Sequence, residues 1–197
     1  MKTKNSKKPI YFVTGNEHKF HEVEKIFNEG LDNFILKHKN LPTLEIQSDS
    51  LKEVAKFKLE SVKSDFSDSL FVEDAGFFIK TPLKGFPGVY SSYVHKTIGN
   101  KGILRLIEDF EETVAYFFAV IALYHKPTDK MLLFKGKTRG KVSSKIRGNK
   151  GFGYDPIFIP EEYPQKTFAE LDIKEKNAIS HRGRALNKLL NFLKENE

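Results

Sequence analysis

The sequence predicts an α/β fold, because short apolar runs typical of buried strands alternate with segments of helical periodicity. The first such pair is a strand over residues 10–13 followed by a helix over residues 17–28. A β-branched and aromatic run over residues 113–124, with a further strand from residue 131, indicates an antiparallel hairpin. The last helix carries an apolar face of leucines, namely Leu186, Leu189, Leu190 and Leu193.

The composition is that of one folded domain. The chain has 197 residues, of which 39% are hydrophobic and 13% aromatic, which is enough to bury one sizeable core. It has no cysteine, which excludes disulfides and thiolate metal sites. No apolar run approaches the ~18–20 residues of a membrane span. We therefore expect a cytoplasmic protein with no membrane partner.

Most of the excess positive charge lies at the N-terminus. The formal net charge is +7, and the first eight residues contain four lysines and no acid. Only five of the 33 basic residues are arginines, whereas proteins that recognise bases in a duplex rely on arginine. We predict a disordered Lys-rich extension over residues 1–8, a single domain over residues 9–197, and no stable nucleic-acid partner.

The turn between the first strand and its helix is a candidate phosphate site. Thr14, Gly15 and Asn16 form the turn, and the helix that begins at Glu17 offers unpaired N–H groups and a positive dipole end. Lys19 adds a full charge in the first turn. The segment lacks the P-loop pattern. Many such units bind no ligand, so these residues alone leave a plain connecting turn as an equal alternative.

The second helix has a predicted capping box, formed by Ser50 and Glu53. Lys58 lies on this helix, where a solvated surface lysine is the ordinary explanation. The chain then has a rigid turn over residues 85–90 and a short predicted helix over residues 100–110.

The central apolar stretch over residues 70–79 predicts a buried strand that ends at Glu73 and Asp74, with Gly76 allowing the backbone to turn. Carboxylates at such a place are costly unless they are used. An acidic strand end without chemistry is the alternative. The later hairpin is likewise expected to turn at glycines, Gly136 and Gly140.

A glycine-rich and aromatic loop covers residues 151–157. Phe152 lies between two glycines and is expected to expose its ring as a stacking face for a base. Asp155 is expected to be extended, because Pro156 follows it. The dinucleotide fingerprint G-x-G-x-x-G is absent, so the sequence does not predict a dinucleotide fold.

The last helix is predicted to begin at a cap formed by Ser180. His181 and Arg182 then lie in its first turn, where a cation works against the helix dipole. That energetic cost indicates a use for Arg182.

Four separated segments resemble the inosine triphosphate pyrophosphatases, also called non-canonical purine NTP pyrophosphatases, with the archaeal branch as the nearest match. The resemblance runs in order from about residue 9 to the C-terminus. The segments are T-G-N-E-H-K (14–19), E-D-A-G (73–76) with G-F-P-G-V-Y-S (85–91), G-F-G-Y-D-P-I-F (151–158) and K-N-A-I-S-H-R-G-R-A (176–185).

This resemblance implies a homodimer whose subunits have a long curved mixed β-sheet flanked by helices, with a central nucleotide cleft between two lobes. The implied reaction is Mg²⁺-dependent hydrolysis of ITP, dITP or XTP to the monophosphate and pyrophosphate. Such an enzyme removes these nucleotides from the nucleotide pool.

The resemblance also implies roles for the matching residues. Asp74 would be the general base and, with Glu45, a ligand of Mg²⁺, although Glu53 is a nearby competitor of Glu45. Ala75 stands where many relatives carry Ser or Thr, so it would contact substrate only through its backbone. The residues implied to contact the triphosphate are Thr14, Gly15, Asn16, Glu17, His18, Lys19, Lys58 and Lys176. Those implied to hold the base are Phe152, Gly153, Tyr154, Asp155, His181 and Arg182.

The chemistry of these residue types suits that reaction. A triphosphate carries about four negative charges, so three lysines, a helix N-terminus and Mg²⁺ are suitable electrostatic partners. Arg182 is a hydrogen-bond donor only, which favours the keto oxygen of hypoxanthine or xanthine over the amino group of adenine. Two alternatives remain open: a Maf-like pyrophosphatase acting on pyrimidine or modified nucleotides, and a non-catalytic nucleotide- or RNA-binding module.

Overall fold

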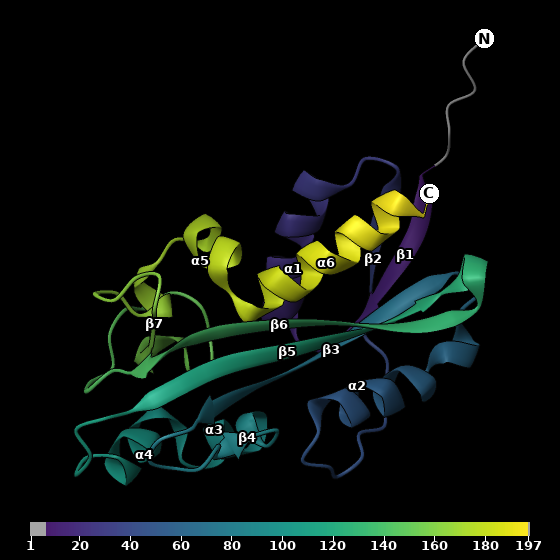
Figure 1. Cartoon of the computed structure of the whole chain (residues 1–197). Coiled ribbons are helices and arrows are strands. Elements are labelled where there is room, and N and C mark those ends of the chain that lie inside the picture. The colour runs from purple at the N-terminus through teal and green to yellow at the C-terminus, as the bar shows by residue number, and fades with distance from the viewer. Residues whose placement is uncertain (1–6, 197) are drawn as a thin grey trace.

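Seven strands form one mixed sheet in the computed structural model, which describes residues 7–196 (Figure 1). The strands are β1 (Lys8–Val13), β2 (Phe34–Lys39), β3 (Ser69–Ile79), β4 (Pro87–Gly88), β5 (Val114–His125), β6 (Lys130–Val142) and β7 (Phe158–Pro160). Their order is β2-β1-β3-β5-β6-β7, with β4 paired to β3 off this path. β1 runs parallel to β2 and β3, whereas the other pairs are antiparallel.

Helices lie on both faces of this sheet (Figure 1). They are α1 (Glu17–Gly30), α2 (Leu51–Glu60), α3 (Ser91–Thr97), α4 (Gly99–Leu106), α5 (Ile173–Ile179) and α6 (His181–Glu195), with short 3-10 turns η1 (Lys63–Asp65), η2 (Lys126–Thr128), η3 (Asp155–Ile157) and η4 (Phe168–Glu170). α1 and α6 cover one face, where the four predicted leucines of α6 are buried, and α2, α3 and α4 lie on the other. The predicted α/β fold, with a mixed sheet flanked by helices, is confirmed.

An opening in the sheet determines where a site can form. β1 pairs with β3 only as far as Phe12 opposite Phe71, and β4 pairs with β3 at Phe77 and Phe78. Between these points, residues 73–76 have β5 on one side and no described strand on the other. The central strand β3 therefore has one unpaired side along residues 73–76.

The prediction that the central strand ends at Glu73 and Asp74 is wrong, because β3 continues through both residues to Ile79. Gly76 lies inside the strand and makes no turn. A Cβ atom at this position would overlap the carbonyl oxygen of Gly88 on β4. The glycine permits two backbones to approach closely.

Gly136 and Gly140 are not turn points either, because β6 runs through both of them. The hairpin turns instead at η2, where Asp129 adopts a left-handed conformation with φ of 52°. A Cβ atom on Gly136 would lie 2.6 Å from the backbone nitrogen of Ala185. This glycine therefore lets α6 lie directly against the sheet.

Smaller differences concern the boundaries of elements. Lys8 is the first residue of β1, so this strand begins earlier than predicted, and residues 1–6 of the predicted extension lie outside the described part of the chain. The Ser50 side chain precedes α2 but makes no cap hydrogen bond, and the Glu53 carboxylate pairs with Lys56 at 3.1 Å. The predicted capping box is therefore wrong. α3 was not predicted, and none of the described helices is long and apolar enough to cross a membrane.

Candidate functional site

A cleft of about 710 Å³ lies beside the open edge of β3. Every residue that the sequence analysis assigned to a site lines this cleft, although these residues come from separate elements of the fold. They are Thr14, Gly15, Asn16, Glu17, His18, Lys19, Glu45, Lys58, Asp74, Ala75, Phe152, Gly153, Tyr154, Asp155, Lys176, His181 and Arg182. The competing metal candidate, Glu53, does not line it.

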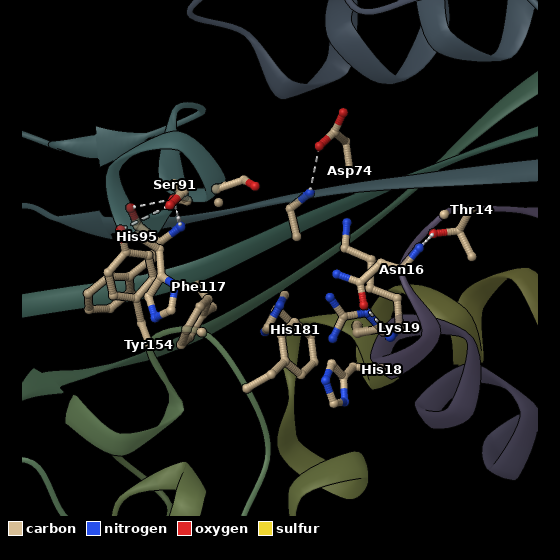
Figure 2. Close-up of a pocket in the computed structure, with 18 of the residues that line it drawn as sticks. Thr14, Asn16, His18, Lys19, Asp74, Ser91, His95, Phe117, Tyr154 and His181 are labelled. Atoms are coloured by element: carbon tan, nitrogen blue, oxygen red, sulfur yellow. Dashed lines mark hydrogen bonds between the residues drawn. The ribbon is translucent and has the colours of Figure 1, made fainter. Parts of the chain in front are cut away.

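The N-terminus of α1 forms one wall of the cleft (Figure 2). The Asn16 side chain caps this helix, since its Oδ1 accepts a hydrogen bond from the Lys19 N–H at 3.1 Å. The Asn16 N–H in turn donates to Thr14 Oγ1 at 3.1 Å. The N–H groups of Glu17 and His18 have no partner in the described part of the chain, as expected at a helix start. This wall can therefore donate hydrogen bonds to an anion.

Glu73 and Asp74 point to opposite faces of the sheet, as successive residues of a strand do. Figure 2 shows Asp74 on one side of β3 and Lys19 on the other. The buried Glu73 carboxylate lies 2.7 Å from Lys19 Nζ and 3.2 Å from Arg182 Nη2. Asp74 is half-buried, and its Oδ2 lies 3.9 Å from Lys58 Nζ on α2. The two carboxylates therefore serve two different groups of side chains.

A buried network of charges joins α1, α5 and α6 at one end of the cleft. Lys176 Nζ lies 2.6 Å from Glu22 Oε1 and 2.6 Å from Asp155 Oδ2. Arg182 Nη1 donates to Glu22 Oε2 at 2.5 Å, and its Nη2 faces Glu73. Each of these side chains is at most 6% exposed. The charge of Arg182, which the helix dipole disfavours, is thus compensated by two carboxylates.

The pKa shifts of this network follow from burial and pairing. Burial raises the pKa of any carboxyl group, but in Glu22 and Glu73 the nearby cations, first of all Arg182, outweigh it and lower the pKa. In Asp155 burial dominates and raises the pKa, although Lys176 opposes the shift. Glu22 and Glu73 are therefore held ionised by their partners.

The other end of the cleft is more open. Glu45 lies in the loop before α2, is exposed, and accepts a hydrogen bond from Lys58 Nζ at 2.6 Å. Burial raises the pKa of Asp74, although the charges of Lys19 and Lys58 work against this shift. A carboxylate with a raised pKa is a stronger base than an exposed aspartate.

Asp74 and Glu45 provide carboxylate oxygens of the kind that Mg²⁺ prefers. Asp74 Oδ2 is buried and accepts no hydrogen bond in the described part of the chain. The described residues contain no group of three or more His, Asp or Glu side chains that could hold a metal. Mg²⁺ commonly takes one or two carboxylates and completes its shell with phosphate and water. The residues present fit an ion bound in that way.

The aromatic loop differs from its prediction in two respects. Phe152 is partly buried and does not stand free, because its ring stacks on His18 with centroids 5.2 Å apart and planes inclined by 13°. Asp155 is not extended but begins η3. Its Oδ2 accepts a hydrogen bond from the Phe152 N–H at 2.7 Å and pairs with Lys176. These contacts outweigh the local preference imposed by the following proline.

The start of α6 agrees with its prediction. Ser180 Oγ accepts a hydrogen bond from the Gly183 N–H at 3.0 Å. His181 is buried and stacks on Phe117 at 4.6 Å, and burial together with the charge of Arg182 holds its pKa well below the ordinary value. Its imidazole is therefore neutral. Nδ1 of His181 and Nε of Arg182 have no hydrogen-bond partner among the described residues, and both residues line the cleft.

Glu22 does not line the cleft but pairs with Lys176 and Arg182, which do, and the sequence analysis missed it. It lies three residues after Lys19, and residues at this spacing share one side of a helix. That spacing was the available signal, because it places a carboxylate on the same side of α1 as Lys19. Its partners could not be known from the spacing.

The wall formed by α3 was also missed. Ser91 Oγ donates to the Gly88 carbonyl at 2.6 Å and accepts from the Phe77 N–H at 2.7 Å. The Ser91 carbonyl accepts from the Tyr154 hydroxyl at 3.0 Å. Only Ser91 and Val94 of this helix are buried, so it lacks the apolar periodicity that would have revealed it.

Comparisons with known proteins identify the family of the chain. The Ham1 family matches residues 10–192 of the chain. A dITP/XTP pyrophosphatase of Pyrococcus horikoshii is 47% identical over 188 residues, which are 95% of this chain and 97% of that protein. A dITP/XTP pyrophosphatase of Thermococcus kodakarensis is 45% identical over 188 residues, which are 95% of this chain and 98% of that protein.

Solved structures show the same fold. The Ham1 protein of Staphylococcus aureus superposes with a TM-score of 0.80 at 26% identity, over 96% of this chain and 100% of that chain. A HAM1 protein from Coxiella burnetii also has a TM-score of 0.80, at 30% identity, over 95% of this chain and 99% of that chain. The match therefore covers the sheet, both helical layers and the cleft.

Proposed function

The chain belongs to the Ham1 family, and on that premise we propose that it hydrolyses dITP, XTP and ITP to the nucleoside monophosphate and pyrophosphate. The predicted family, its archaeal branch and the predicted hydrolase class are confirmed by relatives named dITP/XTP pyrophosphatase. The Maf-like and non-catalytic alternatives are set aside for the same reason. The observation that carries the proposal is that the matching motif residues line one cleft.

We assign the phosphates to the open end of the cleft. The free N–H groups at the start of α1, together with Lys19 and Lys58, are donors for phosphate oxygens. Mg²⁺ held by Asp74 and Glu45 would neutralise phosphate charge there. Asp74 would orient the attacking water and take its proton, a role that its raised pKa favours.

We assign the base to the buried end. The Nε of Arg182 is a donor without a partner among the described residues, and a 6-keto oxygen would accept its hydrogen bond. The amino group of adenine would leave that buried donor unpaired. Lys176 is held between Glu22 and Asp155, and its Nζ lies 5.1 Å from the centroid of the Phe152 ring. We therefore propose that Lys176 fixes the loop that carries Phe152. The family resemblance further leads us to propose a homodimer that works in the cytoplasm.

The test is release of pyrophosphate from a panel of nucleoside triphosphates, with and without Mg²⁺. We expect rapid release from dITP, XTP and ITP, little from ATP, and none when Mg²⁺ is removed by a chelator. Equal turnover of ATP would contradict the base selectivity. Activity that survives chelation would contradict the metal assignment.

A further inference from the structure

Most cations that line the cleft are already neutralised by acids. Lys19 pairs with Glu73 at 2.7 Å and Lys58 with Glu45 at 2.6 Å. Lys176 and Arg182 are shared among buried carboxylates, as described above. The three lysines that the sequence offered to a triphosphate therefore do not represent three free charges. A ligand with about four negative charges needs further positive charge, in addition to the metal.

Lys96 differs from these cations. It lies on α3, is exposed, and lines the same cleft. In the described part of the chain it makes no ion pair and no hydrogen bond. A lysine without an acidic partner can bind phosphate without first breaking an existing ion pair.

Lys96 lines the cleft together with Glu45, and the two charges are close enough to interact. The ammonium group of Lys96 therefore acts on the carboxylate that we assign to the metal. The stacked Phe152 ring lies at the other end, on the loop that carries the base assignments.

The helix that carries Lys96 is firmly attached to the cleft wall. Ser91, at its start, is bonded to β3 and β4 by its hydroxyl and to Tyr154 by its carbonyl. His95 packs edge-on against the Tyr154 ring, with centroids 5.1 Å apart. Lys96 thus projects from a fixed base, which lowers the entropy lost when its side chain binds a ligand.

We propose that Lys96 binds the terminal phosphates of the substrate and holds them as the pyrophosphate leaving group. The inference rests on the proposed function, because it extends the same site. In the reaction the water oxygen forms a bond to the α-phosphorus and gives its proton to Asp74. The bond from that phosphorus to the bridging oxygen breaks, and its electron pair leaves with pyrophosphate. Lys96 offsets the charge that develops on this leaving group.

The experiment compares Lys96→Gln with a matched control, Lys101→Gln. Lys101 is exposed on the neighbouring helix α4 and does not line the cleft, so both variants lose one exposed positive charge. We expect Lys96→Gln to weaken inhibition by inorganic pyrophosphate roughly ten- to a hundred-fold, the range of a charge-assisted hydrogen bond. kcat/KM for ITP should fall by a similar factor. Inhibition by IMP, which lacks the terminal phosphates, should be unchanged, and Lys101→Gln should match the parent.

Three results would overturn the proposal: pyrophosphate inhibiting Lys96→Gln as strongly as the parent, inhibition by IMP weakening equally, or Lys101→Gln showing the same loss. Lys96→Arg should restore most of the affinity if the charge is what matters. If the parent hydrolyses no nucleoside triphosphate, the proposed function fails first. Calorimetric titration of the three proteins with pyrophosphate then decides the role of Lys96 without any turnover.

Discussion

The two ends of the cleft hold their charges in different ways. At the base end, Glu22, Lys176 and Arg182 are buried and each contacts more than one charged partner. At the phosphate end, Glu45 and Lys96 are exposed and Asp74 is half-buried. The end that we assign to the base is therefore held by buried ion pairs before a ligand arrives. In our proposal, metal and phosphate complete the other end.

The energetic reason lies in the solvent. A buried charge that loses its partner keeps the full cost of desolvation, so the network at the base end cannot rearrange cheaply. An exposed ion pair contributes little, because water replaces the partner. The Glu45 carboxylate, which is 57% exposed, can therefore exchange its contact with Lys58 for contacts with a ligand. We expect mutations at the open end to affect mainly catalysis and mutations at the buried end to affect mainly stability.

The largest expected effect is on turnover at the open end. Asp74→Asn keeps the size of the side chain and removes the charge that we propose as base and metal ligand, so kcat for ITP should fall by roughly 10²–10⁴-fold. Stability should be unchanged or slightly higher, because burial disfavours the ionised form. The control is Asp65→Asn, which changes an exposed aspartate outside the cleft and should leave turnover unchanged. If Asp74→Asn turned over ITP as fast as the parent, Asp74 would have only a structural role.

The next effect is on stability at the buried end. Glu22→Gln removes the carboxylate that Lys176 and Arg182 share, and breaking such a buried pair costs about 3–5 kcal/mol in the free energy of unfolding. Glu45→Gln, whose side chain is 57% exposed, should lower stability by less than about 1 kcal/mol while it reduces activity. Urea unfolding of both variants measures the difference. Equal losses would show that the two ends are not held differently.

A smaller effect is expected on base selectivity. Arg182→Lys retains a cation for Glu22 and Glu73 but removes the free Nε donor. The ratio of kcat/KM for ITP to that for ATP should fall roughly ten- to a hundred-fold. Arg184→Lys is the matched control, since Arg184 pairs with Glu162 outside the cleft. A proportional loss on both nucleotides would assign Arg182 to phosphate binding instead.

The smallest effect is a change in how stability depends on pH. The pKa of Glu22 is lowered from its usual value of 4.5, so the stability it contributes is present above pH 4.5 and is lost as the pH falls through its folded value. Unfolding free energies measured from neutral to acid pH should fall less steeply in Glu22→Gln than in the parent. Identical pH dependence would mean that Glu22 is not held ionised by its partners.

The sequence by itself determined what depends on local chemistry. The strand before residue 14, the cap at Ser180, the leucine face of α6 and the site motifs follow from residues close together in the chain. The motifs also identified the family, from which the proposed reaction follows. The strand, the cap and the leucine face agree with the structure, and the family agrees with the comparisons.

Only the tertiary structure decided how the charges are paired and which backbones meet. Glu22 and Lys176 are 154 positions apart, and no local rule connects them. Gly76 and Gly136 lie in strands and not in turns, because they face the backbones of β4 and α6, which fold against them from elsewhere in the chain. Lys96 is significant for the same reason: folding brings its helix to the cleft, where Lys96 forms no ion pair within residues 7–196. A charge or a glycine has a local preference, but its environment is supplied by distant segments, and that environment determines its role.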